Sequence, residues 1–132
     1  MSAAEADAVT RVADQLFTAI ENSDMATVGR LFSDDIAVWR TGARSDDDKE
    51  RALRVLRWFI DVTADRRYEI LDRQLFSGPV TGFVQQHILH ASGHNGESIA
   101  MRVCIVIKLG VNTLISRIDE YFDPAGIAPL MS

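Results

Sequence analysis

The second half of the chain constrains the fold most. After residues 65–67 its apolar pattern changes from helical to alternating, and it stays alternating to residue 123. The alternating pattern predicts four strands in succession, at residues 68–76, 82–91, 98–109 and 114–123. The links between them are short and contain Gly, Ser or Asn. Consecutive strands on short loops pair as antiparallel neighbours, so this half predicts an antiparallel meander.

The first half of the chain has the three- and four-residue apolar spacing of amphipathic helices. We expect helices at residues 4–22, 25–32 and 45–63, with a short strand at 36–40. Ser45 and Asp48 have the spacing of a capping box, so the third helix is expected to begin there.

This order predicts one α+β domain over residues 1–132. It is a cone in which three N-terminal helices pack on a curved, mainly antiparallel sheet. A chain of 132 residues is long enough for one domain with a core, and no repeat or linker divides it. Because a twisted sheet curls and the helices cover only part of its concave face, a pocket is expected between the two layers.

Composition excludes several classes of function. The net charge is -5 and no run of Lys or Arg occurs, which argues against a nucleic-acid partner. No apolar run reaches membrane-spanning length, and the first residues lack a signal-peptide pattern. The single cysteine, Cys104, lies in an apolar strand and is expected to be a buried small hydrophobe. We therefore expect a cytoplasmic protein that binds neither nucleic acid nor membrane.

The last strand carries the main candidate for chemistry. Alternation places Glu120 on a face that is otherwise apolar apart from a serine, between Ile118 and Phe122. Burial among such side chains raises the pKa of a carboxyl group, and a carboxyl that titrates near neutral pH suits acid–base catalysis. Two alternatives remain open: Glu120 pairs with a buried cation such as Arg102, or it lies at the rim in water.

His87 is the second catalytic candidate, because an imidazole exchanges protons near neutral pH. The alternation of its strand does not show which face is the inner one, so a structural or solvent-facing histidine is the alternative. His90 shares this ambiguity, and His94 lies in a hairpin loop. Three His and one Cys in separate settings form no metal-ligand cluster, and no glycine-rich phosphate loop occurs. We predict no metal and no cofactor.

Five apolar or aromatic residues are candidates for binding a substrate: Trp39, Phe17, Ile118, Phe122 and Trp58. Trp39 is expected near the mouth of the cone because it lies on the short first strand. The alternative for each aromatic residue is a place in the core.

The element order and the ending Arg117-Ile-Asp-Glu-Tyr-Phe-Asp123 resemble the nuclear-transport-factor-2-like superfamily. The most similar branch is the SnoaL-like, ketosteroid-isomerase-like and limonene-epoxide-hydrolase-like group. The stretch Gly82-Phe-Val-Gln-Gln-His-Ile-Leu-His90 is also similar to a sheet segment of SnoaL-like proteins. The resemblance implies the cone fold, a small-molecule pocket and a homodimer formed through the sheet. The expected outer face of the last strand, with Ile115 and Tyr121 among charged residues, suits such a dimer.

The resemblance transfers catalytic residues only in part. Limonene-epoxide hydrolases have an acid at the position of Glu120, but their Arg and Asp on an earlier strand correspond to residues 85–88, which contain neither. Their Asp–Arg–Asp relay is therefore not expected. The Asp and Tyr of ketosteroid isomerases correspond to the region of Trp39-Arg40 and to Phe17, which cannot replace them. SnoaL-like cyclases have a His on the middle strand and an acid on the last, which match His87 and Glu120.

These observations predict a cofactor-independent isomerase, cyclase or hydrolase that acts on a polyketide-, terpenoid- or steroid-like compound. A ligand-binding module without chemistry and a dimeric assembly domain of the same fold remain the alternatives.

Overall fold

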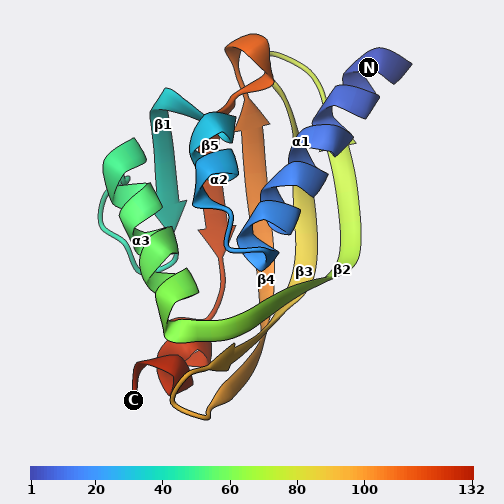
Figure 1. Ribbon diagram of the computed structural model, residues 1–132. Coiled ribbons are helices and arrows are strands. Elements are labelled where there is room, and N and C mark those ends of the chain that lie inside the picture. Colours follow the sequence, from blue (N-terminus) through green and yellow to red (C-terminus); the bar gives the residue numbers. More distant parts are fainter.

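The computed structural model describes residues 1–132 and has the predicted α+β architecture. Three helices lie against one face of a five-stranded sheet (Figure 1). The strand order is β1-β5-β4-β3-β2; β1 runs parallel to β5, and all other neighbours are antiparallel. The elements are α1 (Ala3–Glu21), α2 (Met25–Leu31), β1 (Phe32–Arg40), α3 (Lys49–Val62), β2 (Thr63–Phe76), β3 (Thr81–Gly93), β4 (Ser98–Leu109), η1 (Val111–Thr113), β5 (Ile115–Tyr121) and η2 (Pro124–Met131).

Each helix begins at a side chain that accepts a hydrogen bond from the exposed backbone of the first turn. Ser2 caps α1 and forms a capping box with Glu5, and Asp24 caps α2. Asp48 caps α3 by accepting from the Arg51 backbone N–H at 3.0 Å. The predicted start of this helix at Ser45 was therefore wrong, because the capping residue is Asp48, which the prediction had placed three residues inside the helix.

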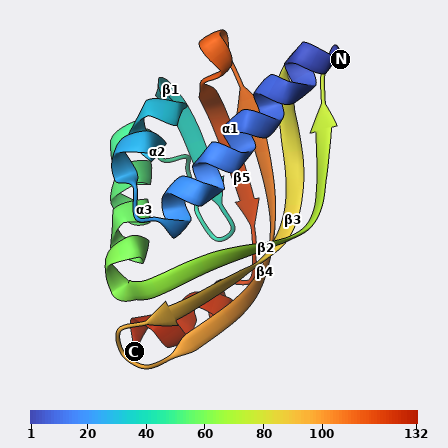
Figure 2. The same ribbon diagram turned by 45° about the vertical axis from the view of Figure 1, so that its right-hand side comes forward.

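The sheet is strongly curved, and β2 begins directly at the end of α3. The sequence predicted a break at residues 65–67, but Thr63 already belongs to the strand. Register shifts between Thr63 and Asp65 and between Ile70 and Asp72 bend β2 further. The lower ends of β2, β3 and β4 curl beneath α3 (Figure 2).

The C-terminal segment η2 was not predicted, and it follows β5 where that strand was expected to continue to residue 123. Asn95 in the β3–β4 hairpin donates from Nδ2 to the carbonyls of Pro129 and Ser132, both at 3.0 Å. Leu130 is buried in the core. The segment thus closes the lower end of the cone, as Figure 2 shows.

The core lies between the helices and the concave face of the sheet. In β3 and β4 the odd-numbered side chains from Phe83 to Ala91 and from Ile99 to Leu109 point inward. In β5 the alternation is interrupted by a register shift opposite Lys108 and Leu109. Ile115 is therefore fully buried, although simple alternation placed it on the outer face. None of the helices is long and apolar enough to span a membrane.

Candidate functional site

Glu120 and Arg40 lie side by side because β1 pairs in parallel with β5 and the two residues are register partners. The Arg40 Nε is 3.5 Å from Glu120 Oε1, and its Nη1 donates to Asp47 Oδ2 at 3.0 Å. Asp47 is held against β1 by a pair of backbone hydrogen bonds with Val38. The result is a chain of two acids joined by one guanidinium group.

An apolar cavity lies next to this ion pair and has two lobes, which meet at Arg40 and Glu120. The outer lobe has a volume of about 180 Å³ and the inner lobe about 50 Å³. Four residues line both lobes: Arg40, Leu56, Tyr68 and Glu120. The outer lobe is completed by Val55, Trp58, Phe59, Leu89, Met101, Phe122 and Ile127. The inner lobe is completed by Leu16, Phe17, Ile20, Phe32, Val38, Ala52, Ile105 and Ile118.

The environment of Glu120 favours its protonated form. Its side chain is 27% exposed, and the cavity surrounds it with apolar groups. Burial raises the pKa of Glu120, and the positive charge of Arg40 opposes part of that shift. Burial and the negative charge of Glu120 also raise the pKa of Tyr68, so its hydroxyl stays protonated and can donate a hydrogen bond. Glu120 can therefore exchange a proton in a cavity where the Tyr68 hydroxyl is available as a hydrogen-bond donor.

No protein-family model and no curated protein matches the sequence significantly. Solved structures do match. They include an LEH-like epoxide hydrolase from M. tuberculosis (TM-score 0.74, 18% identity), with 96% of this chain and 90% of that chain covered. An NTF2-like protein from Burkholderia pseudomallei matches over 100% of both chains (TM-score 0.77, 15% identity). A Shewanella denitrificans protein named as a SnoaL-like polyketide cyclase matches over 98% of both (TM-score 0.74, 16% identity). The chain has the nuclear-transport-factor-2-like fold.

Within this nuclear-transport-factor-2-like fold, the cation beside the last-strand acid comes from an unexpected element. The resemblance to limonene-epoxide hydrolases places that cation at residues 85–88, which contain none. The structure supplies Arg40 from β1, between Asp47 and Glu120. Arg102, the cation proposed for Glu120 from the sequence, lies on the outer face and donates to Gln86 Oε1 at 2.9 Å. Arg102 is therefore not the partner of Glu120, whereas the alternative that a cation pairs with Glu120 is confirmed, with the partly buried Arg40 as that cation.

His87 points inward but does not reach the cavity. It is 1% exposed, and β4 separates its strand from β5, so the two backbones lie at least two strand spacings, roughly 10 Å, apart. They are also offset along the sheet, because His87 pairs with Val103 and Glu120 with Ile105. Gln85 Nε2 lies 2.9 Å from His87 Nδ1, while Gln85 Oε1 accepts from Arg73. This pattern makes Nδ1 the acceptor and leaves the proton on Nε2, which has no partner. Burial lowers the pKa of His87 to about 4, so the ring is neutral. The structure does not bring His87 and Glu120 together.

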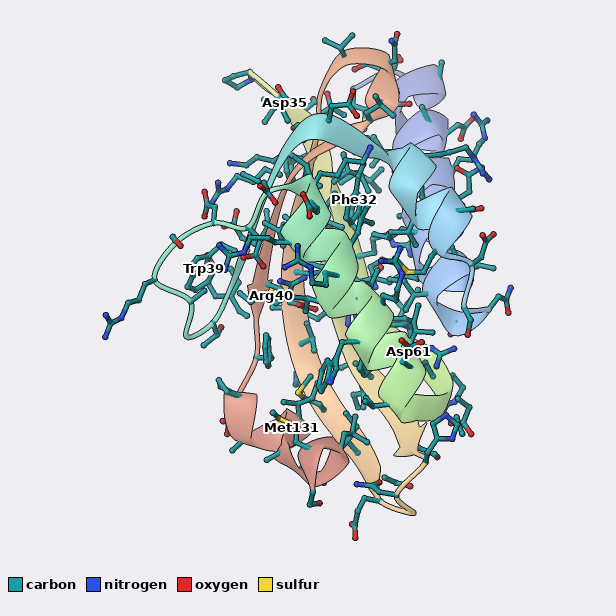
Figure 3. The ribbon with its side chains drawn as sticks, turned by 60° about the vertical axis from the view of Figure 1, so that its left-hand side comes forward. Phe32, Asp35, Trp39, Arg40, Asp61 and Met131 are labelled. Carbon is teal, nitrogen blue, oxygen red and sulfur yellow. The ribbon has the colours of Figure 1, made fainter.

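The five predicted binding residues are found in three places. Phe17 and Ile118 line the inner lobe, whereas Phe122 and Trp58 line the outer lobe. Trp39 lies outside both, so its expected place at the cavity was wrong. Its indole N–H donates to the Ala43 carbonyl at 3.0 Å, and its ring packs on Tyr121 across the outer face. Figure 3 shows Arg40 beside α3 and Trp39 beside the loop that follows β1.

Sequence reasoning missed two polar residues of the cavity. Arg40 was not among the candidate residues, although alternation from the buried Val38 gives it an inward direction. Tyr68 was not among them either. Its backbone N–H donates to Glu21 Oε2 at 2.8 Å and its ring packs on Phe17, which together fix it against α1. No group of three or more His, Cys, Asp or Glu side chains converges where it could hold a metal ion.

Proposed function

We propose that the chain is a cofactor-independent enzyme that moves a proton on a small apolar molecule. One observation carries this proposal: a carboxyl group with a raised pKa, Glu120, lies at the junction of two lobes of an otherwise apolar cavity. Such a combination of concavity, apolar lining and one perturbed acid is typical of active sites. Structural neighbours named as an epoxide hydrolase and a polyketide cyclase are consistent with chemistry in this fold.

Three side chains have separate roles in the proposed reaction. Ionised Glu120 accepts a proton from a substrate carbon or from a water molecule, and it returns the proton in its acid form. Arg40, held by Asp47, limits how far burial disfavours the ionised carboxylate. The Tyr68 hydroxyl donates to a substrate oxygen that gains negative charge. Return of the proton to another carbon of the substrate gives isomerisation. If the carbanion instead attacks a carbonyl carbon of the same molecule, a ring closes and Glu120 returns the proton to the new alkoxide oxygen, which is cyclisation. If Glu120 takes the proton from water, the hydroxide adds to an epoxide carbon, the C–O bond of the ring breaks and Glu120 returns the proton to the released oxygen, which is hydrolysis.

The experiment is a turnover screen with no added cofactor. One-ring epoxides and β,γ-unsaturated ketones are incubated with the protein in D₂O or in ¹⁸O-labelled water, and mass spectrometry follows proton exchange and water addition. We expect turnover of at least one compound, and we expect Val55→Trp at the mouth of the outer lobe to reduce it. Val111→Trp, at an exposed position in η1, should leave it unchanged. Binding without turnover of any compound would instead favour a ligand-binding module.

A ligand-binding function is the second candidate, and the Arg40–Glu120 contact favours it. A paired carboxylate can have a purely structural role, because the arginine compensates the buried charge. In that case the cavity would still bind neutral molecules, and Glu120→Gln would bind them at least as tightly as the parent protein.

We also propose that the protein is a homodimer formed through the outer face of the sheet. Partly exposed apolar side chains gather there among polar ones: Val84 and Ile88 of β3, Cys104 and Val106 of β4, and Tyr121 of β5. Light scattering should give twice the chain mass of 14.7 kDa, and Val106→Asp should give the monomer. A monomeric parent protein at 100 µM would contradict the proposal.

A further inference from the structure

The cavity and its charges point to a narrower class of ligand. We propose that the site takes a neutral molecule with one ring or about ten carbon atoms and a single oxygen function, such as an alcohol, ketone or epoxide. This inference rests on the proposed function, because it names the compounds on which Glu120 acts. It also narrows the range predicted from the sequence, which extended to steroids.

Size is the first argument. The outer lobe, at about 180 Å³, is well below the roughly 300–1,000 Å³ of sites for drug-sized ligands. A cavity of about 150 Å³ is enough for benzene, so the outer lobe suits one substituted ring. The inner lobe, at about 50 Å³, has room for no more than one or two water molecules. A fused four-ring skeleton exceeds both lobes.

Charge is the second argument. Arg40 and Glu120 are the only charged residues that line the two lobes, and Arg40 also pairs with Asp47. With Glu120 ionised, Arg40, Asp47 and Glu120 together carry one net negative charge; with Glu120 protonated, they carry none. Arg51 also pairs with Asp47, at 3.7 Å, but it is 64% exposed and lines neither lobe. An anionic ligand would lose its hydration in an apolar cavity without meeting a free positive charge. A cationic ligand would also lose its hydration, and Glu120, the one acid that lines the lobes, is already paired with Arg40. The site therefore selects against carboxylates, phosphates and amines.

The position of the polar groups is the third argument, because it orients the ligand. Arg40, Tyr68 and Glu120 all lie where the lobes meet, so the oxygen of the ligand belongs at the junction. The outer lobe is otherwise apolar and lies between α3 and the β5–η2 segment, with Trp58 and Phe122 among its aromatic walls. The ring of the ligand belongs there. Tyr68 supplies a donor for the ligand's oxygen, and protonated Glu120 supplies a second.

A matched set of four probes tests the inference: 4-isopropylcyclohexanone, the corresponding carboxylate, the corresponding amine and androstenedione. Trp58 reports binding, because it lines the outer lobe and is 39% exposed. The chain has two tryptophans, so Trp39→Phe leaves Trp58 as the only indole. We expect the ketone to change Trp58 fluorescence with a dissociation constant below about 1 mM. The carboxylate and the amine should bind at least tenfold more weakly, and the steroid should not bind.

The outcomes separate this inference from the proposed function. If the carboxylate or the amine binds best, the charge argument is wrong; if androstenedione binds as well as the ketone, the size argument is wrong. Either result leaves catalysis by Glu120 intact. Binding of the ketone with no turnover of any compound would contradict the proposed enzymatic function but would support the proposed class of ligand. If no probe changes Trp58 fluorescence and none is turned over, both fail. In Glu120→Gln we expect carboxylate binding to strengthen and ketone binding to change less than about twofold.

Discussion

Replacing Glu120 by Gln is expected to reduce turnover at least about 100-fold and, at neutral pH, to make the protein more stable. General acid–base catalysis contributes about 10²–10⁴-fold in rate, and an amide cannot exchange the proton that the reaction needs. The same change removes a carboxylate whose ionised form is disfavoured by burial. Loss of activity would therefore not be a consequence of unfolding.

The pH dependence of this stability difference has a defined sign. Burial raises the pKa of Glu120 above its ordinary value of 4.5, with Arg40 opposing part of the shift. The unfolded chain then loses the proton at a lower pH than the folded protein does. This contribution to stability is complete below about pH 4.5, declines as pH rises to the folded pKa, and is constant above it. Glu120→Gln lacks this decline.

Urea unfolding at pH 4 and pH 8, together with the turnover assay, checks both expectations. Glu97→Gln is the matched control, because Glu97 is an exposed carboxylate in the β3–β4 hairpin, away from the cavity. It should change neither activity nor the pH dependence. Undiminished turnover in Glu120→Gln would exclude Glu120 as the proton carrier. A loss of stability at pH 8 would show that the contact with Arg40 outweighs burial.

The fold could be predicted from the sequence because its signals are local and repeated. Helical spacing in the first 63 residues and alternation after them determine the order of the elements, and short loops determine the antiparallel pairing. What could not be predicted depends on register or on distant partners. The spacing of apolar residues does not reveal the register shift beside Ile115. Nor does it reveal the parallel pairing of β1 with β5 that brings Arg40 to Glu120.

The candidate site was predictable only for residues whose direction follows from the core. Ile118 and Phe17 lie on clear apolar stripes, and both line the cavity. His87 shares an inward face with Phe83 and Gln85, but a polar glutamine on that face made the two sides of the strand look alike. Gln85 is buried because Arg73 and His87 satisfy its amide group, which only the folded chain reveals.

Arg66→Met is expected to destabilise the protein by about 3 kcal/mol, a large part of the total stability of a typical domain. Arg66 is 7% exposed, and no carboxylate pairs with its side chain. Its guanidinium instead donates to the carbonyls of Ile20 at 2.9 Å and Thr63 at 3.3 Å, to Thr63 Oγ1 at 2.6 Å, and to Ser23 Oγ. These groups lie at the C-terminal ends of α1 and α3, where the helix dipoles are negative. Methionine would fill similar space and leave these buried acceptors without donors.

Arg67→Met is the control that separates this network from a general loss of charge. Arg67 is the next residue of β2 and is exposed, so its replacement should change stability by less than about 0.5 kcal/mol. Arg66→Lys should fall between the two, because an ammonium group cannot reach both helix ends in the planar geometry of guanidinium. Urea denaturation of the three variants measures the differences. Equal losses in Arg66→Met and Arg67→Met would contradict the view that the Arg66 guanidinium joins the ends of α1 and α3 to the start of β2.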